Sequence, residues 1–341
     1  MSVPVVAFFN NKGGVGKTSL VYHLAWMMSD LGTSVLAVDL DPQANLTSSF
    51  LDEDRLSVLW DDDGKSTSTI FSAIQPLIDG SGDIADMEIE RINGTLHLIV
   101  GDLNLSLFED QLSETWPKCL NEDVRAFRVT SAFWRITQKA AQECGATLIL
   151  FDLGPNLGAI NRACLISSDW VVIPIAPDLY SLQGLRNLGP KLRSWRKDWK
   201  ERIEKRPKMN FDLPSGEVTP AGYIVMQHSE RLDRPVKAYA KWMRRIPEAY
   251  HVSVLDDRIF SGKDPKSDGE NLALVKHFRS LMPMAQEARK PVFHLKAADG
   301  AIGAHASAAE ELGKNFKVLA QRILARIGLG ASPSSTSEPP A

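Results

Sequence analysis

Short apolar runs alternate with stretches of helical apolar spacing along most of this chain of 341 residues. Continuous apolar runs of this length are typical of strands that are buried on both faces of a parallel sheet. The runs that we predict to be strands are 3–9, 35–38, 96–100, 146–151, 170–176 and 221–226. The stretches predicted to be helical are 17–30, 69–77, 105–112, 121–143, 178–188 and 314–327. This alternation predicts an α/β fold with a doubly wound, mostly parallel sheet flanked by helices.

The turn between the first strand and the first helix is rich in glycine and carries two lysines, Lys12 and Lys17. Its glycines would let consecutive backbone N–H groups face a phosphate, at the positive end of the helix dipole. Lys17 would reach the β- and γ-phosphates, and the Thr18 hydroxyl would bind Mg²⁺. The usual phosphate-loop motif has a glycine at position 11, where this chain has Asn11. The predicted nucleotide-binding residues are Asn11, Gly13, Gly14, Val15, Gly16, Lys17, Thr18 and Ser19.

Acidic residues follow two of the predicted strands. Asp39 and Asp41 come directly after the run 35–38, and Asp152 follows the apolar run that begins at 146. Because ligands of an open parallel sheet bind beyond the carboxyl ends of its strands, we expect these carboxylates near the phosphate loop. Asp152 would hold Mg²⁺ through a bound water. Acids at strand ends can simply cap the next helix, but two of them followed by Pro-Gln favour a functional role.

The net charge, the cysteine content and the length of the apolar runs each limit the functions that this chain can have. The formal net charge is −3, so contact with nucleic acid requires a local basic patch. The cysteines Cys119, Cys144 and Cys164 are widely spaced, which argues against a disulfide framework and a zinc site and fits a reduced, cytoplasmic setting. The N-terminus lacks the features of a cleaved leader. No apolar run approaches the roughly 20 residues of a membrane span.

Several of these motifs together resemble one known family. The segment 12–18 resembles the deviant Walker A motif of ParA/MinD-type ATPases, Asp39-Leu40-Asp41-Pro42-Gln43 resembles their A′ motif, and Phe151-Asp152 resembles their Walker B motif. The stretches 101–109 and 290–293 are similar to other ParA segments, so the resemblance covers about residues 3–326. The ParA-type ATPases that partition chromosomes and plasmids are the branch it resembles most.

The resemblance implies a homodimer that forms with ATP and uses Mg²⁺. Lys12 would reach across the interface to the partner's nucleotide and Asp41 would position the attacking water, so the implied catalytic residues are Lys12, Lys17 and Asp41. Thr18, Asp39 and Asp152 would form the Mg²⁺ shell. Hydrolysis would be slow until a ParB-like or other partner protein stimulates it. Gly154 stands where ParA proteins often have a proline, which predicts a more mobile loop after Asp152.

The chain is expected to form one P-loop ATPase domain over residues 1–329, with insertions near 51–94 and 191–275. These two regions look longer than in a minimal family member. The Ser/Pro-rich residues 330–341 are predicted to be disordered.

A local excess of positive charge occurs at 191–208. This segment has nine basic and three acidic residues, and nine minus three gives +6. Since ParA relatives bind DNA nonspecifically through basic surface residues, the predicted DNA contacts are Arg186, Lys191, Arg193, Arg196, Lys197 and Lys200. A second basic cluster runs from Arg231 to Arg245. The alternative is a solvated helix whose tryptophans, Trp195 and Trp199, pack on the body of the protein.

Other hypotheses stay open beside DNA partitioning. A MinD-like protein would bind membrane through an amphipathic C-terminal helix, and 314–327 has that spacing, although such a helix more often packs on its own sheet. An ATPase switch could instead position a protein assembly or regulate a defence module without DNA. An amide-forming or ligase-type relative would use the same loop. Gln227 is the candidate contact to the nucleotide base.

Overall fold

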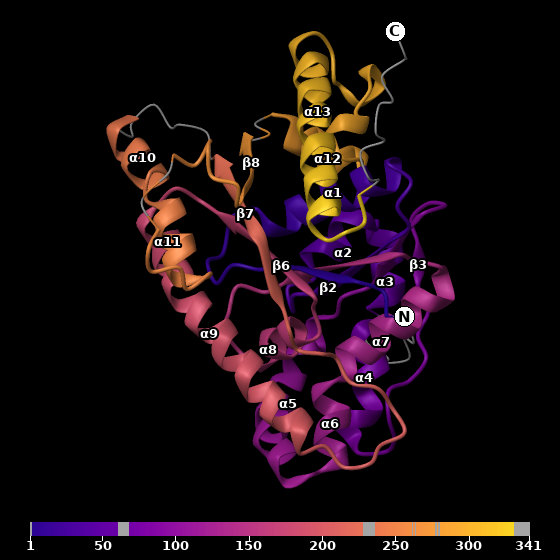
Figure 1. Ribbon diagram of the computed structural model, residues 1–341. Coiled ribbons are helices and arrows are strands. Elements are labelled where there is room, and N and C mark those ends of the chain that lie inside the picture. The colour runs from indigo at the N-terminus through magenta and orange to yellow at the C-terminus, as the bar shows by residue number, and fades with distance from the viewer. Residues whose placement is uncertain are drawn as a thin grey trace, which may run out of the picture.

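Eight strands of the described chain form a single sheet in the order β3-β4-β2-β5-β1-β6-β7-β8 (Figure 1). The computed structural model describes residues 2–60, 68–227, 236–260, 262, 264–276, 278 and 280–330. The strands are β1 (Val5–Phe8), β2 (Val35–Leu40), β3 (Glu90–Arg91), β4 (Leu96–Ile99), β5 (Leu148–Leu153), β6 (Trp170–Ile175), β7 (Thr219–Gln227) and β8 (Asn271–Lys276). All neighbouring pairs are parallel except β3 and β4. The predicted doubly wound, mostly parallel sheet is therefore confirmed.

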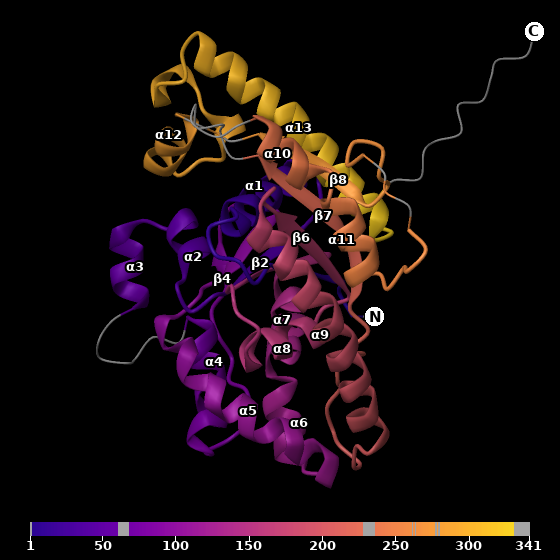
Figure 2. The same cartoon turned by 90° about the vertical axis from the view of Figure 1, so that its left-hand side faces the viewer.

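Helices cover both faces of this sheet (Figure 2). One face packs against α1 (Lys17–Asp30), α2 (Asn45–Phe50), α3 (Glu53–Leu59), α12 (Leu281–Ala288) and α13 (Ala304–Arg326). The opposite face packs against α4 (Ile70–Asp79), α5 (Phe108–Lys118), α6 (Val124–Thr130), α7 (Ala132–Cys144), α8 (Ala159–Ile166), α9 (Leu179–Glu204) and α11 (Ile246–Ser253). The remaining elements are α10 (Val236–Met243) and the 3₁₀ helices η1 (Leu103–Leu107), η2 (Cys119–Asn121), η3 (Val292–His294) and η4 (Ala297–Asp299).

The strand register brings two of the predicted acids to the same level. In the parallel pair of β2 and β5, Asp39 lies directly opposite Asp152. Both strands are buried along their whole length, so a slip of one residue would turn apolar side chains to the wrong face and is disfavoured. The continuous apolar pattern thus fixes the position of two carboxylates at the carboxyl edge of the sheet.

Two predicted helices are divided in the structure. The stretch 121–143 forms α6 and α7, which meet at Ser131, where φ is −94° and ψ is 4°. The stretch 105–112 begins as the 3₁₀ helix η1 and continues as α5 from Phe108. The apolar spacing alone did not reveal either boundary, because spacing continues across a short break.

The apolar side of the C-terminal helix faces the protein. Phe316, Leu319, Ala320 and Ile323 of α13 are buried in the same cluster as α1. The expectation that this helix packs on its own sheet is confirmed. Among the described residues, no helix is both long and apolar enough to span a membrane. The predicted disordered tail 330–341 lies, except for Gly330, outside the described residues.

The helix predicted to begin within 178–188 is α9, which runs to Glu204 and carries most of the basic run. Trp195 and Trp199 on this helix are buried, and the Trp199 indole donates to the Pro214 carbonyl at 3.0 Å. Gly189 allows α11 to approach, because a Cβ atom there would lie 1.8 Å from the Ser253 carbonyl oxygen. The tryptophans therefore hold α9 on the body of the protein.

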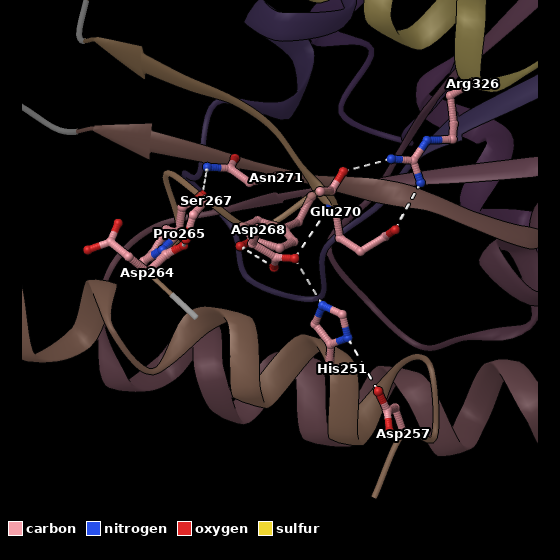
Figure 3. Close-up of polar contacts among 11 residues, drawn as sticks. His251, Asp257, Asp264, Pro265, Ser267, Asp268, Glu270, Asn271 and Arg326 are labelled. Atoms are coloured by element: carbon pink, nitrogen blue, oxygen red, sulfur yellow. Dashed lines mark hydrogen bonds and ion pairs between the residues drawn. The ribbon is translucent and has the colours of Figure 1, made fainter. Parts of the chain in front are cut away.

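A cluster of polar side chains stabilises the start of β8 (Figure 3). The buried Asp268 carboxylate accepts a hydrogen bond from the Tyr223 hydroxyl at 2.9 Å and lies 3.0 Å from Nε2 of His251. The Arg326 guanidinium on α13 donates to the Glu270 carboxylate at 3.0 Å. This cluster lies at the amino end of β8, across the sheet from the acids at the carboxyl edge.

Candidate active site

The glycine turn after β1 adopts a backbone that needs glycine. Gly14 has φ 71° and Gly16 has φ 85°, in the left-handed region that other residues rarely occupy. The Asn10 side chain holds the turn, since its Nδ2 donates to the Pro174 carbonyl at 2.6 Å and its Oδ1 accepts the Lys12 amide at 2.9 Å. Val15 is buried and anchors the turn to the interior. Helix α1 begins directly after this turn, at Lys17.

A cavity of about 590 Å³ opens beside the turn, within the size range of small-molecule sites. Three groups of residues line it. The turn and α1 contribute Gly13, Gly14, Gly16, Lys17, Thr18, Ser19, Tyr22 and His23. The segment after β2 and the loop after β5 contribute Asp41, Gln43, Asn45, Ser48, Ser49 and Pro155, and α12 contributes Met282, Ala285 and Gln286.

Lys17 is buried next to two of the predicted acids. Burial lowers the pKa of Lys17, and the negative charges of Asp152 and Asp41 act in the opposite direction. The two carboxylates favour the charged form of Lys17, and a buried ammonium can bind a phosphate strongly because little water competes for it.

Asp39 is fully buried and its carboxylate is well bonded. One oxygen accepts both the Thr47 amide and the Thr47 hydroxyl at 2.8 Å. Burial raises the pKa of Asp39, and the two bonds from Thr47 partly offset that rise. Asp39 therefore lies behind the cavity and is held in a fixed position by Thr47.

Asp152 is also fully buried, but its carboxylate lacks partners. Within the described residues, neither oxygen has a hydrogen bond of normal geometry. Burial raises the pKa of Asp152 and the charge of Asp39 adds to the rise, while the nearby Thr18 hydroxyl and Lys17 oppose it. A buried carboxylate without partners is unfavourable, and a divalent cation beside Thr18 would relieve it. The residues present therefore fit a Mg²⁺ ion.

Asp41 lies between the cavity and the loop 154–158. It lines the cavity, and its Oδ1 accepts the Gln43 amide at 3.0 Å. A Cβ atom at Gly154 would lie 3.3 Å from the same oxygen, so the loop passes close to this carboxylate. This position allows Asp41 to contact a water in the cavity.

Lys12 lies apart from these acids. Its ammonium is paired with Asp178, which also caps the amino end of α9. Asn11 faces α9 too, since a Cβ atom at Gly184 would lie 2.5 Å from the Asn11 Oδ1. The structure therefore brings Lys17, Thr18 and the three acids together and places Lys12 and Asn11 on the α9 side of the turn.

The wall formed by α12 was not predicted. The Ser19 hydroxyl lies 3.8 Å from the sulfur of Met282, across 263 positions of sequence. Nothing in local spacing signals such a contact. Gln227, the predicted base contact, ends β7, and its side chain lies outside the described structure. Its neighbour Met226 comes close to the turn, because a Cβ atom at Gly16 would lie 3.1 Å from the Met226 methyl group.

The predicted DNA contacts lie along α9. Five of the six are exposed: Arg186, Lys191, Arg196, Lys197 and Lys200. Arg193 is instead half-buried, and its guanidinium donates to the Ser253 carbonyl on α11 at 2.7 Å. Three exposed cations of the second cluster lie near α11 in the segment 241–245, namely Lys241, Arg244 and Arg245. Arg231 and Arg234 of that cluster lie outside the described residues, as does the side chain of Lys237.

Comparison with known proteins places these features in a family. A family model described as an AAA domain matches residues 3–205, more than half of the chain, and this match contains the turn and all three acids. An uncharacterized protein of Methanocaldococcus jannaschii is 27% identical over 258 residues, which cover 68% of this chain and 90% of that protein. The sporulation initiation inhibitor protein Soj of Bacillus subtilis is 28% identical over 184 residues, which cover 54% of this chain and 62% of Soj.

A solved structure shares the fold over nearly the whole chain. The complex of a variant of Cyanothece McdA with ATP has a TM-score of 0.61 and 16% sequence identity, and covers 97% of this chain and 98% of that one. The elements outside the matched segment 3–205, including α12 and α13, therefore belong to the same architecture.

Proposed function

We propose, because this chain belongs to the ParA/MinD-type family of P-loop ATPases, that it is a Mg²⁺-dependent ATPase that moves or segregates DNA cargo. In this proposal, ATP joins two copies of the chain, the dimer binds DNA nonspecifically, and hydrolysis releases it. A ParB-like or other partner stimulates hydrolysis, which is slow without it. The protein would act in the cytoplasm, on nucleoid DNA.

The observation that carries the proposal is that Lys17 and Asp41 line one cavity beside the glycine turn, while Asp152 is buried close enough to act on the charge of Lys17. Lys17 would hold the β- and γ-phosphates, and the turn would surround them with backbone N–H groups. Asp41 would orient the attacking water, since its carboxylate lines the cavity next to the loop 154–158. The nucleotide in the solved McdA complex is ATP, which supports ATP as the ligand of this cavity.

Mg²⁺ would be held by Thr18, Asp39 and Asp152. The partnerless oxygens of Asp152 support this assignment. Bound Mg²⁺ would neutralise charge on the β- and γ-phosphates. Among the described residues, no three acidic, histidine or cysteine side chains are arranged to hold a metal alone. Mg²⁺ usually binds through one or two carboxylates together with substrate phosphates and water, and this is the arrangement we assign.

Exposed apolar side chains near the cavity support dimerisation with a second copy of the chain. Leu103 and Leu107 are exposed on η1, and Leu179 and Tyr180 are exposed at the start of α9. Both segments follow the carboxyl ends of parallel strands, so both lie at the edge of the sheet that carries the cavity. Large apolar side chains left at a surface are typical of interfaces. Lys12 at this edge would then reach the partner's nucleotide.

The exposed cations of α9 support DNA as the surface that the dimer binds. They lie on one helix whose tryptophans are buried, so the charges are presented on its outer side. Contacts of this kind neutralise phosphates without reading bases, which gives salt-sensitive, sequence-independent binding. The competing hypothesis is an ATPase that positions a protein assembly without binding DNA. Such an ATPase would use the same cavity, and only the role of the exposed surface of α9 would differ.

The nucleotide part is tested with Asp152→Asn and Lys17→Ala. We expect the wild-type protein to bind and hydrolyse ATP only with Mg²⁺. Lys17→Ala should abolish binding, and Asp152→Asn should bind ATP but lose the dependence on Mg²⁺ and most of the turnover. Wild-type turnover by either variant would contradict the assignment of the cavity as the ATPase site.

A further inference from the structure

Helix α8 begins directly after the loop 154–158, and a distant residue caps its first turn. Gly158, at the cap position, has no side chain. The Ala159 and Ile160 amides donate instead to the two carboxylate oxygens of Glu109, on α5, and the bond from Ile160 is 2.9 Å long. A carboxylate that accepts amides at a helix start also interacts favourably with the helix dipole. Glu109 therefore ties α5 to the start of α8.

Glycine at position 158 leaves room for Glu109 in the position that it occupies. A Cβ atom at Gly158 would lie 2.5 Å from Oε1 of Glu109, closer than such atoms can come. Its φ of −79° is one that any residue adopts, so backbone conformation is not the reason for a glycine here. The Glu109 carboxylate therefore occupies space that a side chain at position 158 would otherwise fill.

The first turn of α8 in turn holds the loop 154–158. The Asn161 amide group donates to the Gly154 carbonyl at 2.9 Å and to the Asn156 carbonyl at 2.7 Å. Gly154 lies against the Asp41 carboxylate. A shift of α8 would therefore move the loop that borders the cavity.

At the same amino-terminal end that carries Glu109, α5 is also connected to the segment that carries Asp39. The Thr47 hydroxyl donates to the Asp39 carboxylate at 2.8 Å and accepts the Gly101 amide at 2.9 Å. Asp102 follows and caps η1, which leads directly into α5 and Glu109. The contacts thus run from Asp39 through η1 and Glu109 to α8, and from α8 back to Asp41.

We infer that Glu109 is a positioning residue that couples the loop after Asp152 to the segment after Asp39. It does not line the cavity, so it acts through α8 and Asn161 rather than on the nucleotide. This role rests on the proposed ATPase function of the same site. In that function, the segment after Asp39 and the loop after Asp152 must respond together to the γ-phosphate. The contacts of Glu109 join these two segments, so that they move together.

The test compares Glu109→Gln with the control Glu114→Gln, using the full chain. The glutamine side chain introduced at position 109 has one acceptor oxygen and would face the second N–H group with its own NH₂ group, so one of the two bonds is lost. Glu114 lies on the same helix, is exposed, and pairs only weakly with Lys118, 3.9 Å away. Both substitutions remove one negative charge from α5. The two variants therefore differ only in whether a bond between position 109 and the start of α8 is lost.

Three quantities are measured: hydrogen exchange of the Ala159 and Ile160 amides without nucleotide, Mg²⁺-ATP affinity, and single-turnover hydrolysis. We expect Glu109→Gln to speed exchange and to slow hydrolysis, each by about tenfold or more, because a bond to a charged group is lost. ATP affinity should stay within about twofold of wild type, since Glu109 does not touch the cavity. Glu114→Gln should match the wild type in all three. Glu109→Asp keeps the charge but is one methylene shorter, and should give intermediate exchange and turnover.

Two results would overturn the inference. One is unchanged exchange and unchanged turnover in Glu109→Gln. The other is an ATP affinity that falls as much as the rate, which would mean a general disturbance of the site. If the wild-type protein does not hydrolyse ATP, the proposed function fails, and the exchange measurement still decides whether Glu109 caps α8.

Discussion

The Lys12 ammonium is paired with the carboxylate of Asp178, the residue that caps helix α9. Asp178 also accepts the Ser181 amide at 2.9 Å. Partial burial alone would raise the pKa of Asp178, but Lys12 and Ser181 more than offset that effect and hold it below its ordinary value. A lysine that reaches the nucleotide of a partner subunit has to leave this pair. In the proposed dimer this pair would be broken, so it would favour the free protomer.

Asp178→Asn tests this relationship. Asparagine caps a helix about as well as aspartate, so α9 should keep its start while the charge facing Lys12 is removed. Because the two side chains are 29% and 24% exposed, the pair contributes no more than about 1 kcal/mol. We expect dimerisation with ATP to become tighter, by up to about fivefold for each pair released, in sedimentation equilibrium. Glu201→Gln, an exposed change on the same helix, is the control, and a weaker dimer with Asp178→Asn would contradict the role of the pair.

His23 should make the protein sensitive to acid. Its Nε2 accepts the Val292 amide at 3.2 Å, and its ring lies between Phe278 and Phe316. Burial lowers the pKa of His23 from 6.5 to about 4. The unfolded chain therefore binds the proton more readily than the folded one between these values, so stability falls as the pH drops from 6.5 to 4. The loss from this group is about 3 kcal/mol, and nothing is lost above pH 6.5.

Urea unfolding at pH 7, 5.5 and 4.5 measures this dependence. His23→Gln should be less stable at pH 7 but should lose less stability on acidification than the wild type. His305→Gln, a less buried histidine, should follow the wild-type curve. An equal acid slope in wild type and His23→Gln would contradict the assignment.

The exposed cations of α9 should set the salt dependence of DNA binding. Lys191→Ala, Arg196→Ala and Lys200→Ala should each weaken binding to random-sequence duplex and reduce the slope of log K against log salt by about 1 per lost phosphate contact. ATP turnover should not change. Arg193→Ala should instead lower stability, because its guanidinium bonds α11. Lys314→Ala, exposed on α13 on the opposite face of the sheet, should affect neither property.

Asp268 should stabilise the start of β8. Asp268→Ala would leave the Tyr223 hydroxyl and the His251 ring without their buried partner. We expect a loss of about 2–4 kcal/mol in the free energy of unfolding, measured by urea denaturation. Asp264→Ala, an exposed change in the same loop, should cost less than about 0.5 kcal/mol. Equal stability of the two variants would show that the buried contacts of Asp268, the residue at the centre of Figure 3, contribute nothing. ATP affinity should stay unchanged, because the cluster lies across the sheet from the cavity.

The parts of the site that sequence predicts are those encoded locally. The turn 11–18 needs glycine at φ 71° and 85°, and Gly14 and Gly16 stand there, between a buried strand and a helix. Asp39 and Asp152 end buried apolar runs, and the parallel register then places them opposite one another. Each of these features follows from a few consecutive residues together with the rule for parallel sheets.

The parts that sequence does not predict are contacts between distant segments. The α12 wall of the cavity, the Glu109 cap on α8 and the Lys12–Asp178 pair join residues far apart in the chain. Local spacing contains no information about such partners. The break at Ser131 and the 3₁₀ turn at η1 were missed for a different reason, because apolar periodicity continues through a short irregularity.

The most direct test of the central claim is ATP-dependent binding of the protein to random-sequence duplex DNA at two salt concentrations. Wild type is compared with Lys12→Ala and Lys17→Ala. We predict that ATP promotes binding in the wild type, that higher salt weakens it, and that both substitutions abolish it. Wild-type protein that dimerises or hydrolyses ATP but never binds DNA would contradict the partitioning function and would favour a protein assembly as the cargo.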